Sequence, residues 1–223
     1  MKEYFNIRLE FDAERVDAII QTAIENGAKG YVCSIESNNL TYANTHSDFM
    51  EVINNAIVNI CDGSNIAWML GKIHHKPFKP YIGADLFIKY VRMRRYRQYF
   101  LGNTQTVLDG LREQLSGIDP AIAGMDFEEL PFRAVDDFDY EGIAAKINAA
   151  NPDIVWVSLG APKQEKFMSL LLLHLNRGVM FGFGAIFNFY SGVGNVKRAP
   201  LLMRKMRLEW LYRAFEEPRK NIP

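Results

Sequence analysis

The residues best suited to chemistry follow four apolar runs that predict strands. They are small and polar, the types that contact phosphates, sugar hydroxyls and protons. In a parallel sheet such strand ends share one edge, where α/β proteins bind ligands. One such loop is weak evidence, whereas four together predict a binding cleft. The four segments are Ser37-Asn38-Asn39, Cys61-Asp62-Gly63-Ser64-Asn65, Leu101-Gly102-Asn103-Thr104 and Gly160-Ala161-Pro162-Lys163-Gln164-Glu165.

The last of these segments is the most informative. The continuous apolar run Ile154–Leu159 suits a strand covered on both faces, and Gly160 ends it. Pro162 fits the first turn of a following helix. The free N–H groups and the dipole of such a helix favour phosphate, so the segment predicts a nucleotide or phosphate site. A tight strand-to-helix turn without a ligand explains the same pattern, and both interpretations stay open.

Asp62 is the candidate general base. It follows a buried strand and precedes Gly63, which lets the backbone turn sharply. A carboxylate held there can take a proton from an incoming hydroxyl, although capping the next helix is the simpler role for Asp62. Gly102 and Asn103 similarly suit a turn that faces phosphate or ribose, or a helix cap.

Several classes of site lack support. Neither G-x-G-x-x-G after the first strand nor G-x-x-x-x-G-K-[ST] occurs, which removes the main basis for a dinucleotide or P-loop enzyme. The two cysteines and four histidines show no ligand spacing, so no metal site and no cofactor are expected. Few cysteines and no secretory signal predict a reducing cytosol.

Bulk composition is that of a soluble globular protein. The chain has 223 residues, 48% of them apolar and 23% charged, with a formal net charge of zero. This neutrality argues against general nucleic-acid binding. No stretch approaches the roughly 18 apolar residues of a membrane span.

Strand and helix signals alternate along the chain, which predicts an α/β fold: a Rossmann-like, mainly parallel sheet with helices on both faces, and a helical C-terminal segment. Residues 1–196 form the expected catalytic domain and 197–223 a basic amphipathic segment. The expected strands are Tyr4–Phe11, Tyr31–Ile35, Ile57–Cys61, Tyr99–Leu101, Ile118–Ala123, Ile154–Leu159 and Val179–Phe183. The expected helices are 12–26, Asp48–Asn55, Ala84–Arg97, Thr104–Leu115, Tyr140–Ala150 and Lys163–Leu175.

Two basic stretches interleave with apolar residues, one at 89–97 and one after residue 196. Such a pattern suits an anionic membrane surface or a diphosphate, or it is a solvated helix face. The second stretch is the stronger candidate because its apolar content is high. It includes Lys197, Arg198, Arg204, Lys205, Arg207, Arg213, Arg219 and Lys220.

The order of motifs resembles the WecG/TagA/CpsF family of bacterial glycosyltransferases, from the Ser37-Asn38-Asn39 loop to Glu217-Pro218-Arg219. The most specific pieces are Gly160-Ala161-Pro162-Lys163-Gln164-Glu165-Lys166, Lys197-Arg198-Ala199-Pro200 and Leu208-Glu209-Trp210-Leu211-Tyr212-Arg213. The sequence departs from the family pattern at Asn65, Pro80 and Asn188, where glycine, arginine and aspartate are usual.

This resemblance implies an inverting, metal-independent transfer of a sugar, such as N-acetylmannosamine or a related hexose, from a UDP-sugar to a polyprenyl-diphosphate-linked sugar. It also implies that the enzyme acts at the inner face of the cytoplasmic membrane and needs no cofactor. A homo-oligomer is compatible with the resemblance. Asp62 would be the base, and Ser37 would stand where threonine is usual. Donor contacts would come from Asn39, Gly63, Gly102, Asn103, Pro162, Gln164 and Glu165, and diphosphate or acceptor contacts from Arg198, Arg213, Arg219 and Lys220. The alternative is a sugar-nucleotide-binding protein without transferase activity.

Overall fold

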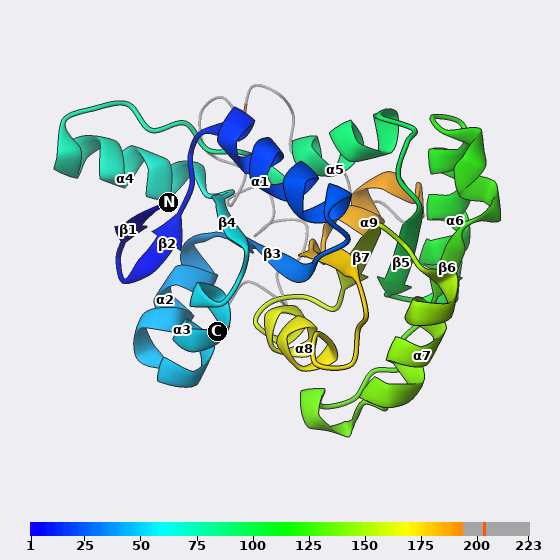
Figure 1. Ribbon diagram of the computed structural model, residues 1–223. Coiled ribbons are helices and arrows are strands. Elements are labelled where there is room, and N and C mark those ends of the chain that lie inside the picture. The colour runs from blue at the N-terminus through cyan, green and yellow to red at the C-terminus, as the bar shows by residue number, and fades with distance from the viewer. Residues whose placement is uncertain (194–202, 204–223) are drawn as a thin grey trace.

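The computed structural model describes residues 1–193 and 203. Six parallel strands form the central sheet in the order β4-β3-β8-β7-β5-β6, and an antiparallel hairpin, β1-β2, stands beside it (Figure 1). The strands are β1 Lys2–Tyr4, β2 Ile7–Leu9, β3 Lys29–Ile35, β4 Val58–Cys61, β5 Gln98–Gly102, β6 Asp126–Glu128, β7 Ile154–Ser158 and β8 Gly178–Gly182.

Helices cover both faces of the sheet, which confirms the predicted α/β class. They are α1 Ala13–Glu25, α2 Ser37–Thr45, α3 Ser47–Asn54, α4 Ser64–His74, α5 Gly83–Arg92, α6 Gln105–Ser116, α7 Tyr140–Ala150, α8 Lys163–Leu171 and α9 Ile186–Tyr190. Two short 3₁₀ turns, Pro120–Gly124 and Val135–Asp137, complete the described elements.

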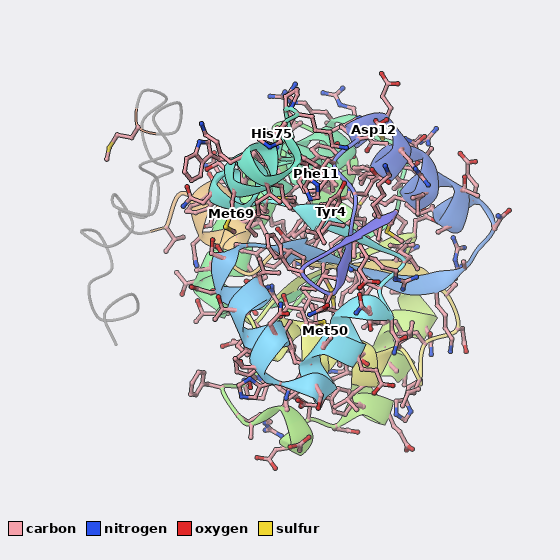
Figure 2. All side chains as sticks on the ribbon, turned by 90° about the vertical axis from the view of Figure 1, so that its left-hand side faces the viewer. Tyr4, Phe11, Asp12, Met50, Met69 and His75 are labelled. Atoms are coloured by element: carbon pink, nitrogen blue, oxygen red, sulfur yellow. The ribbon has the colours of Figure 1, made fainter. Side chains whose placement is uncertain are left out.

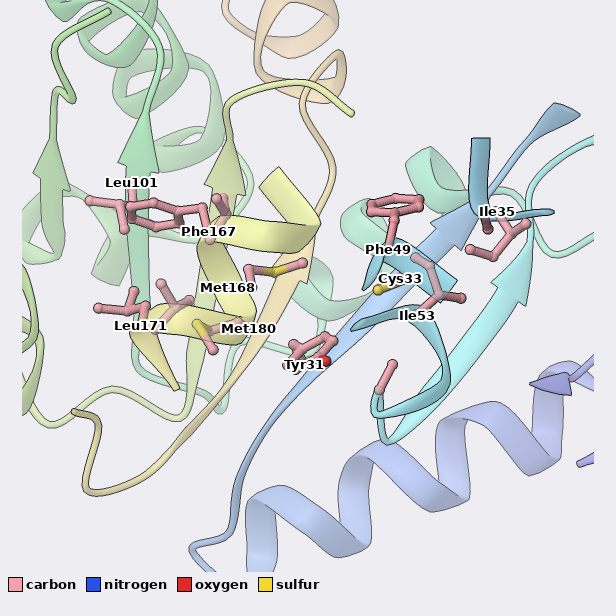
Figure 3. Packing of buried hydrophobic residues seen from close by; sticks show 14 of the residues in the cluster. Tyr31, Cys33, Ile35, Phe49, Ile53, Leu101, Phe167, Met168, Leu171 and Met180 are labelled. Carbon is pink, nitrogen blue, oxygen red and sulfur yellow. The ribbon is translucent and has the colours of Figure 1, made fainter. Parts of the chain in front are cut away.

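β4, β5, β7 and β8 are buried along their whole length, so their side chains divide between two cores. On β7, Val155 and Val157 join one core, whereas Ile154 and Trp156 join the other. The first core also takes apolar residues of α2, α3, α7 and α8, and Figure 3 shows part of this layer. The second takes those of α1, α5, α6 and α9. This period-two alternation explains why the strands read as continuous apolar runs.

The connections reverse direction between β5 and β7. The chain leaves β5 into α6 on one face and leaves β7 into α8 on the other. Ligands bind at such switch points, outside the carboxyl ends of the strands. The fold therefore brings all four polar segments to one edge of a single sheet, as predicted.

Two predicted strands were wrong. The segment Tyr4–Phe11 turns back at Phe5 and Asn6, which adopt φ of 52° and 63° and so close a two-residue hairpin turn. The segment Ile118–Ala123 is interrupted by a 3₁₀ turn, because Asp119 accepts a hydrogen bond from Ala121 N and a proline follows it. The edge strand forms later, as β6.

The structure also differs from the predicted bounds of several helices. The helix expected to end at Arg97 ends at Arg92, since Arg94 has a φ of 52° and the chain turns there into β5. The Ser37-Asn38-Asn39 segment is the first turn of α2, not a loop. The helix expected over Lys163–Leu175 ends at Leu171. The predicted C-terminal segment 197–223 and the domain boundary at 196 lie outside the described residues, apart from Met203.

Candidate active site

Asp62 stands at the carboxyl edge of the sheet, immediately after β4. Its backbone N–H and that of Gly63 both donate to Ile35 O on β3, at 3.1 and 3.3 Å. Ser34 Oγ, also on β3, donates to Asp62 Oδ2 at 2.8 Å. Two adjacent strands thus fix both the backbone and the carboxylate of a half-buried residue, which suits a group that must meet a reactant in one geometry.

The first turn of α5 approaches this carboxylate. A Cβ placed on Gly83 would lie 3.1 Å from Asp62 Oδ2 and 3.4 Å from Ser34 Oγ. Glycine is therefore the residue that lets the helix begin so close to the two side chains. The N-terminus of a helix carries partial positive charge, which attracts a carboxylate.

A hydrogen-bonded chain runs from this pair to α8. Asn39 Nδ2 donates to Ser34 O at 3.3 Å and to Glu165 Oε1 at 3.2 Å. Gln164 Nε2 donates to the same Glu165 oxygen and to Gly182 O, each at 3.0 Å. Residues far apart in sequence, from α2, β3, α8 and β8, are thereby held as one unit.

Glu165 is fully buried, and burial raises its pKa to about 7. The hydrogen bonds from Gln164 and Asn39 act in the opposite direction. Within the part of the chain that the structure describes, Glu165 Oε2 and Gln164 Oε1 are buried without a hydrogen-bond partner. Such atoms carry a desolvation cost unless something satisfies them.

Asn103 organises the other half of the edge, at the β5–β7 switch point. Its φ is 66°, its N–H donates to Ser158 O at 3.0 Å, and its Oδ1 accepts from Thr104 N. Its Nδ2 donates to Ser158 Oγ at 3.1 Å and to Asn188 Oδ1 at 3.3 Å. Thr104, not Asn103, is the N-cap residue of α6, and among the described residues no side chain caps this helix, so Asn103 serves instead in a network that fixes the turn facing the cleft.

The Asp62 half and the Asn103 half of the site meet around Gly184. Ser158 Oγ donates to Gly184 O at 2.7 Å. A Cβ on Gly184 would lie 2.9 Å from Gln164 Oε1 and 2.8 Å from Gly160 N. Pro162, after a cis peptide bond, stands at the N-terminal cap of α8. The Asp62 cluster and the Asn103 cluster are therefore neighbours along one continuous edge.

Helix N-termini point to this edge from several sides. α2 follows β3, α4 follows β4, α6 follows β5 and α8 follows β7, while α5 begins beside Asp62. Their free N–H groups and dipoles favour negative charge, which matches a diphosphate.

The structure brings most of the predicted site residues together. Asp62, Gly63, Asn39, Gln164 and Glu165 belong to one cluster, and Gly102, Asn103 and Pro162 lie along the same edge. Ser37 is an exposed residue of the first turn of α2; the hydroxyl that donates to Asp62 Oδ2 belongs to Ser34. Arg198, Arg213, Arg219 and Lys220 lie outside the described residues.

Sequence reasoning missed four residues of the site. Ser34 and Ser158 carried a signal: each is a polar residue inside an otherwise apolar strand. Asn188 was singled out only as a departure from the family pattern, and Gly83 was not assigned to the site. In residues 1–193 and 203, no group of three or more His, Cys, Asp or Glu side chains is arranged to hold a metal ion.

The comparisons with known proteins identify the family. The model of the glycosyl transferase WecG/TagA/CpsF family matches residues 4–223. The chain belongs to this family. It is therefore a glycosyltransferase, as the motifs had indicated.

Two relatives share one name, N-acetylglucosaminyldiphosphoundecaprenol N-acetyl-beta-D-mannosaminyltransferase. The protein from Staphylococcus aureus (strain NCTC 8325 / PS 47) is 28% identical over 182 residues, which is 78% of this chain and 67% of that protein. The protein from Bacillus subtilis (strain 168) is 30% identical over 176 residues, 77% of this chain and 65% of that protein. The matched region thus spans about two thirds of each relative.

Proposed function

We propose that this chain transfers N-acetylmannosamine, or a related sugar, from UDP to a sugar hydroxyl on a polyprenyl diphosphate, with inversion at the anomeric carbon. The observation that carries the proposal is the carboxylate of Asp62, fixed by Ser34 at a strand-end edge surrounded by helix N-termini. The names of the relatives, which specify an undecaprenyl-diphosphate acceptor and a β-linked product, support the substrate classes.

In the proposed step, Asp62 accepts the proton of the acceptor hydroxyl. The acceptor oxygen forms a bond to the anomeric carbon while the bond between that carbon and the UDP oxygen breaks. UDP leaves with the electron pair. Attack from the side opposite the leaving group inverts the anomeric centre, and the Ser34 hydrogen bond keeps the carboxylate aimed during the transfer.

The leaving diphosphate gains charge as the bond breaks. The N-termini of α6 and α8, beside Asn103 and Pro162, would stabilise it. We further propose, from the resemblance, that Arg198, Arg213, Arg219 and Lys220 contact the diphosphates. Asn39, Gln164 and Glu165, which are buried, would support the donor-sugar site from within the fold, and the catalytic role of Ser37 stays a prediction.

We place the reaction at the inner face of the cytoplasmic membrane, with the protein peripherally attached, because the proposed acceptor is lipid-linked. Among the described helices none is long and apolar enough to span a bilayer. A homo-oligomer stays a prediction, as does independence from metals and cofactors.

The test is UDP release from a panel of UDP-sugars, with a short-chain prenyl-diphosphate-N-acetylglucosamine acceptor and EDTA present. We expect acceptor-dependent release that is lost in Asp62→Asn while UDP binding persists. Release that stops with EDTA would refute metal independence. UDP binding without release, for every donor, would favour the alternative of a sugar-nucleotide-binding protein, and failure to bind UDP would refute both.

A further inference from the structure

Helix α4 has an apolar side that faces solvent. Its inward residues Ile66, Ala67 and Leu70 are at most 2% exposed and join the first core. On the outward side, Trp68 is 50% exposed, Met69 39% and Ile73 53%. These are three of the five large apolar side chains that are exposed in the described part of the chain, so the concentration on one short helix is distinctive.

The outward side is a stripe of two adjoining rows. Met69 and Ile73 are four residues apart and therefore neighbours in one row, and Trp68 and Lys72 are neighbours in the other. The aromatic rings of Tyr4, Phe11 and Phe78 pack together and against His74, which fixes the end of α4 on the β1-β2 hairpin. Figure 1 shows α4 at the margin of the molecule, and Figure 2 shows Met69 and His75 on that side.

The charged side chains that α4 and the loop after it contribute are all of one sign. Lys72 lies within the stripe, and Lys76 and Lys79 follow it in the loop; all three are exposed. The sequence has no aspartate or glutamate between Asp62 and Asp85. Apolar side chains that include a tryptophan, bordered by lysines, match the headgroup boundary of an anionic bilayer.

The position of α4 links this surface to the site. The helix begins at Ser64, two residues after Asp62, and its 11 residues extend about 16 Å. A surface bound along α4 therefore lies close to the strand-end edge where the carboxylate stands. A reactant anchored in a bilayer by its lipid tail reaches that edge only when the bilayer surface is near.

We propose that the outward side of α4, with Trp68, Met69, Ile73 and their lysine border, is the surface that rests on an anionic membrane and sets the site at headgroup height. This inference rests on the proposed lipid-linked acceptor. A second copy of the chain fits less well, because a two-fold contact through this side would set the lysine borders against each other.

The first experiment follows Trp68 directly. The chain has three tryptophans; Trp156 is fully buried, so in a Trp210→Phe background a vesicle-dependent change of emission reports on Trp68. With vesicles of phosphatidylglycerol and phosphatidylcholine we expect a blue shift, and quenching by lipids brominated on the acyl chain. Vesicle binding without either change would overturn the proposal.

The second experiment compares matched variants of the full chain by vesicle flotation. We expect Trp68→Gln/Ile73→Gln to weaken binding about tenfold or more. The control Phe132→Gln/Leu173→Gln removes two exposed apolar side chains elsewhere and should bind as the parent does. Lys72→Gln/Lys76→Gln/Lys79→Gln should weaken binding to anionic vesicles and flatten its salt dependence. Equal binding by all variants would refute the proposal.

Two further readouts separate the rival explanations. If Trp68→Gln/Ile73→Gln dissociates an oligomer in solution and leaves vesicle binding intact, the surface joins copies of the chain and the membrane proposal fails. On the proposed reaction, this variant should lose more turnover with a long-chain acceptor in vesicles than with a short-chain acceptor in solution. Should the parent use neither acceptor, the proposed function fails, while flotation and quenching still decide the role of α4.

Discussion

Asn39 and Glu165 are 126 positions apart in the sequence, yet Asn39 Nδ2 lies 3.2 Å from Glu165 Oε1 in the interior. This contact joins α2 to α8 and places a carboxyl group where water does not reach. Because burial disfavours the charged form, the pKa of Glu165 rises from its ordinary value of 4.5 to about 7. The group that links the two halves of the site is thus also one that titrates near neutral pH.

The first prediction concerns stability against pH. Between the unfolded pKa of 4.5 and the folded pKa of about 7, the native state keeps a proton on Glu165 that the unfolded chain has released. The contribution of Glu165 to the free energy of unfolding is therefore fully present below pH 4.5, and it is lost as the pH rises to about 7. Over this pH range the parent should lose on the order of 3 kcal/mol of unfolding free energy through Glu165. Glutamine does not titrate, so Glu165→Gln should not show this loss.

Urea unfolding of both proteins from pH 4.5 to 8 checks this. The variant should gain stability relative to the parent as pH rises, and Glu113→Gln, at an exposed glutamate, should show no such gain. A constant difference between Glu165→Gln and the parent across this range would mean that Glu165 does not titrate as described.

Much of the fold was readable because its strands are buried on both faces. The run Ile154–Leu159 predicted β7, and the polar residues at four strand ends predicted one edge, since parallel strands end together. The hairpin was not readable. Its turn uses Phe5 and Asn6 at positive φ, without the glycine that usually marks such turns.

The site was only partly predictable from the sequence, because some of its contacts depend on which distant segments pack together. Asp62 follows its strand directly, and position alone singled it out. The partnership with Ser34 depends on which strands pair, and the burial of Glu165 depends on how α2 packs near α8. Neither the sheet order nor that packing has a local pattern in the sequence.

The second prediction concerns the Ser34 hydroxyl. Ser34→Ala removes the donor to Asp62 Oδ2, so the carboxylate loses its fixed direction. We expect kcat to fall about tenfold to a hundredfold, with the Kd for UDP unchanged. Ser34→Thr keeps a hydroxyl and should restore most of the rate. Steady-state kinetics with UDP titrations decide; a Thr variant as slow as the Ala variant would argue against the hydrogen bond.

The third prediction concerns Gly83. Alanine favours a helix over glycine, which offsets part of the crowding at this buried first residue of α5, so Gly83→Ala should change the melting temperature little. Its Cβ would nevertheless stand 3.1 Å from Asp62 Oδ2, closer than ordinary contact, and should displace the carboxylate. We expect kcat to drop about tenfold or more. Gly124→Ala, where a Cβ meets nothing within 4 Å, is the control, and equal rates for the two variants would contradict the expectation.

The fourth prediction separates backbone conformation from crowding. Gly102 has a φ of 98° and Gly27 a φ of 62°, so alanine is strained at both. At Gly27 a Cβ meets nothing within 4 Å, whereas at Gly102 it would lie 2.6 Å from Ser158 O, a backbone atom. We expect Gly27→Ala to cost about 1 kcal/mol of unfolding free energy and Gly102→Ala at least about 2 kcal/mol more.

Crowding at Gly102 should also weaken the binding of UDP. Asn103 N donates to the same Ser158 oxygen, so pushing the two strand ends apart moves the turn that we place beside UDP. Gly102→Ala should therefore bind UDP more weakly than the parent, while Gly27→Ala binds it equally. Paired chemical denaturation and UDP titration measure both effects. Equal destabilisation by the two substitutions would show that the β5–β7 edge relaxes, and unchanged UDP affinity would move the nucleotide away from Asn103.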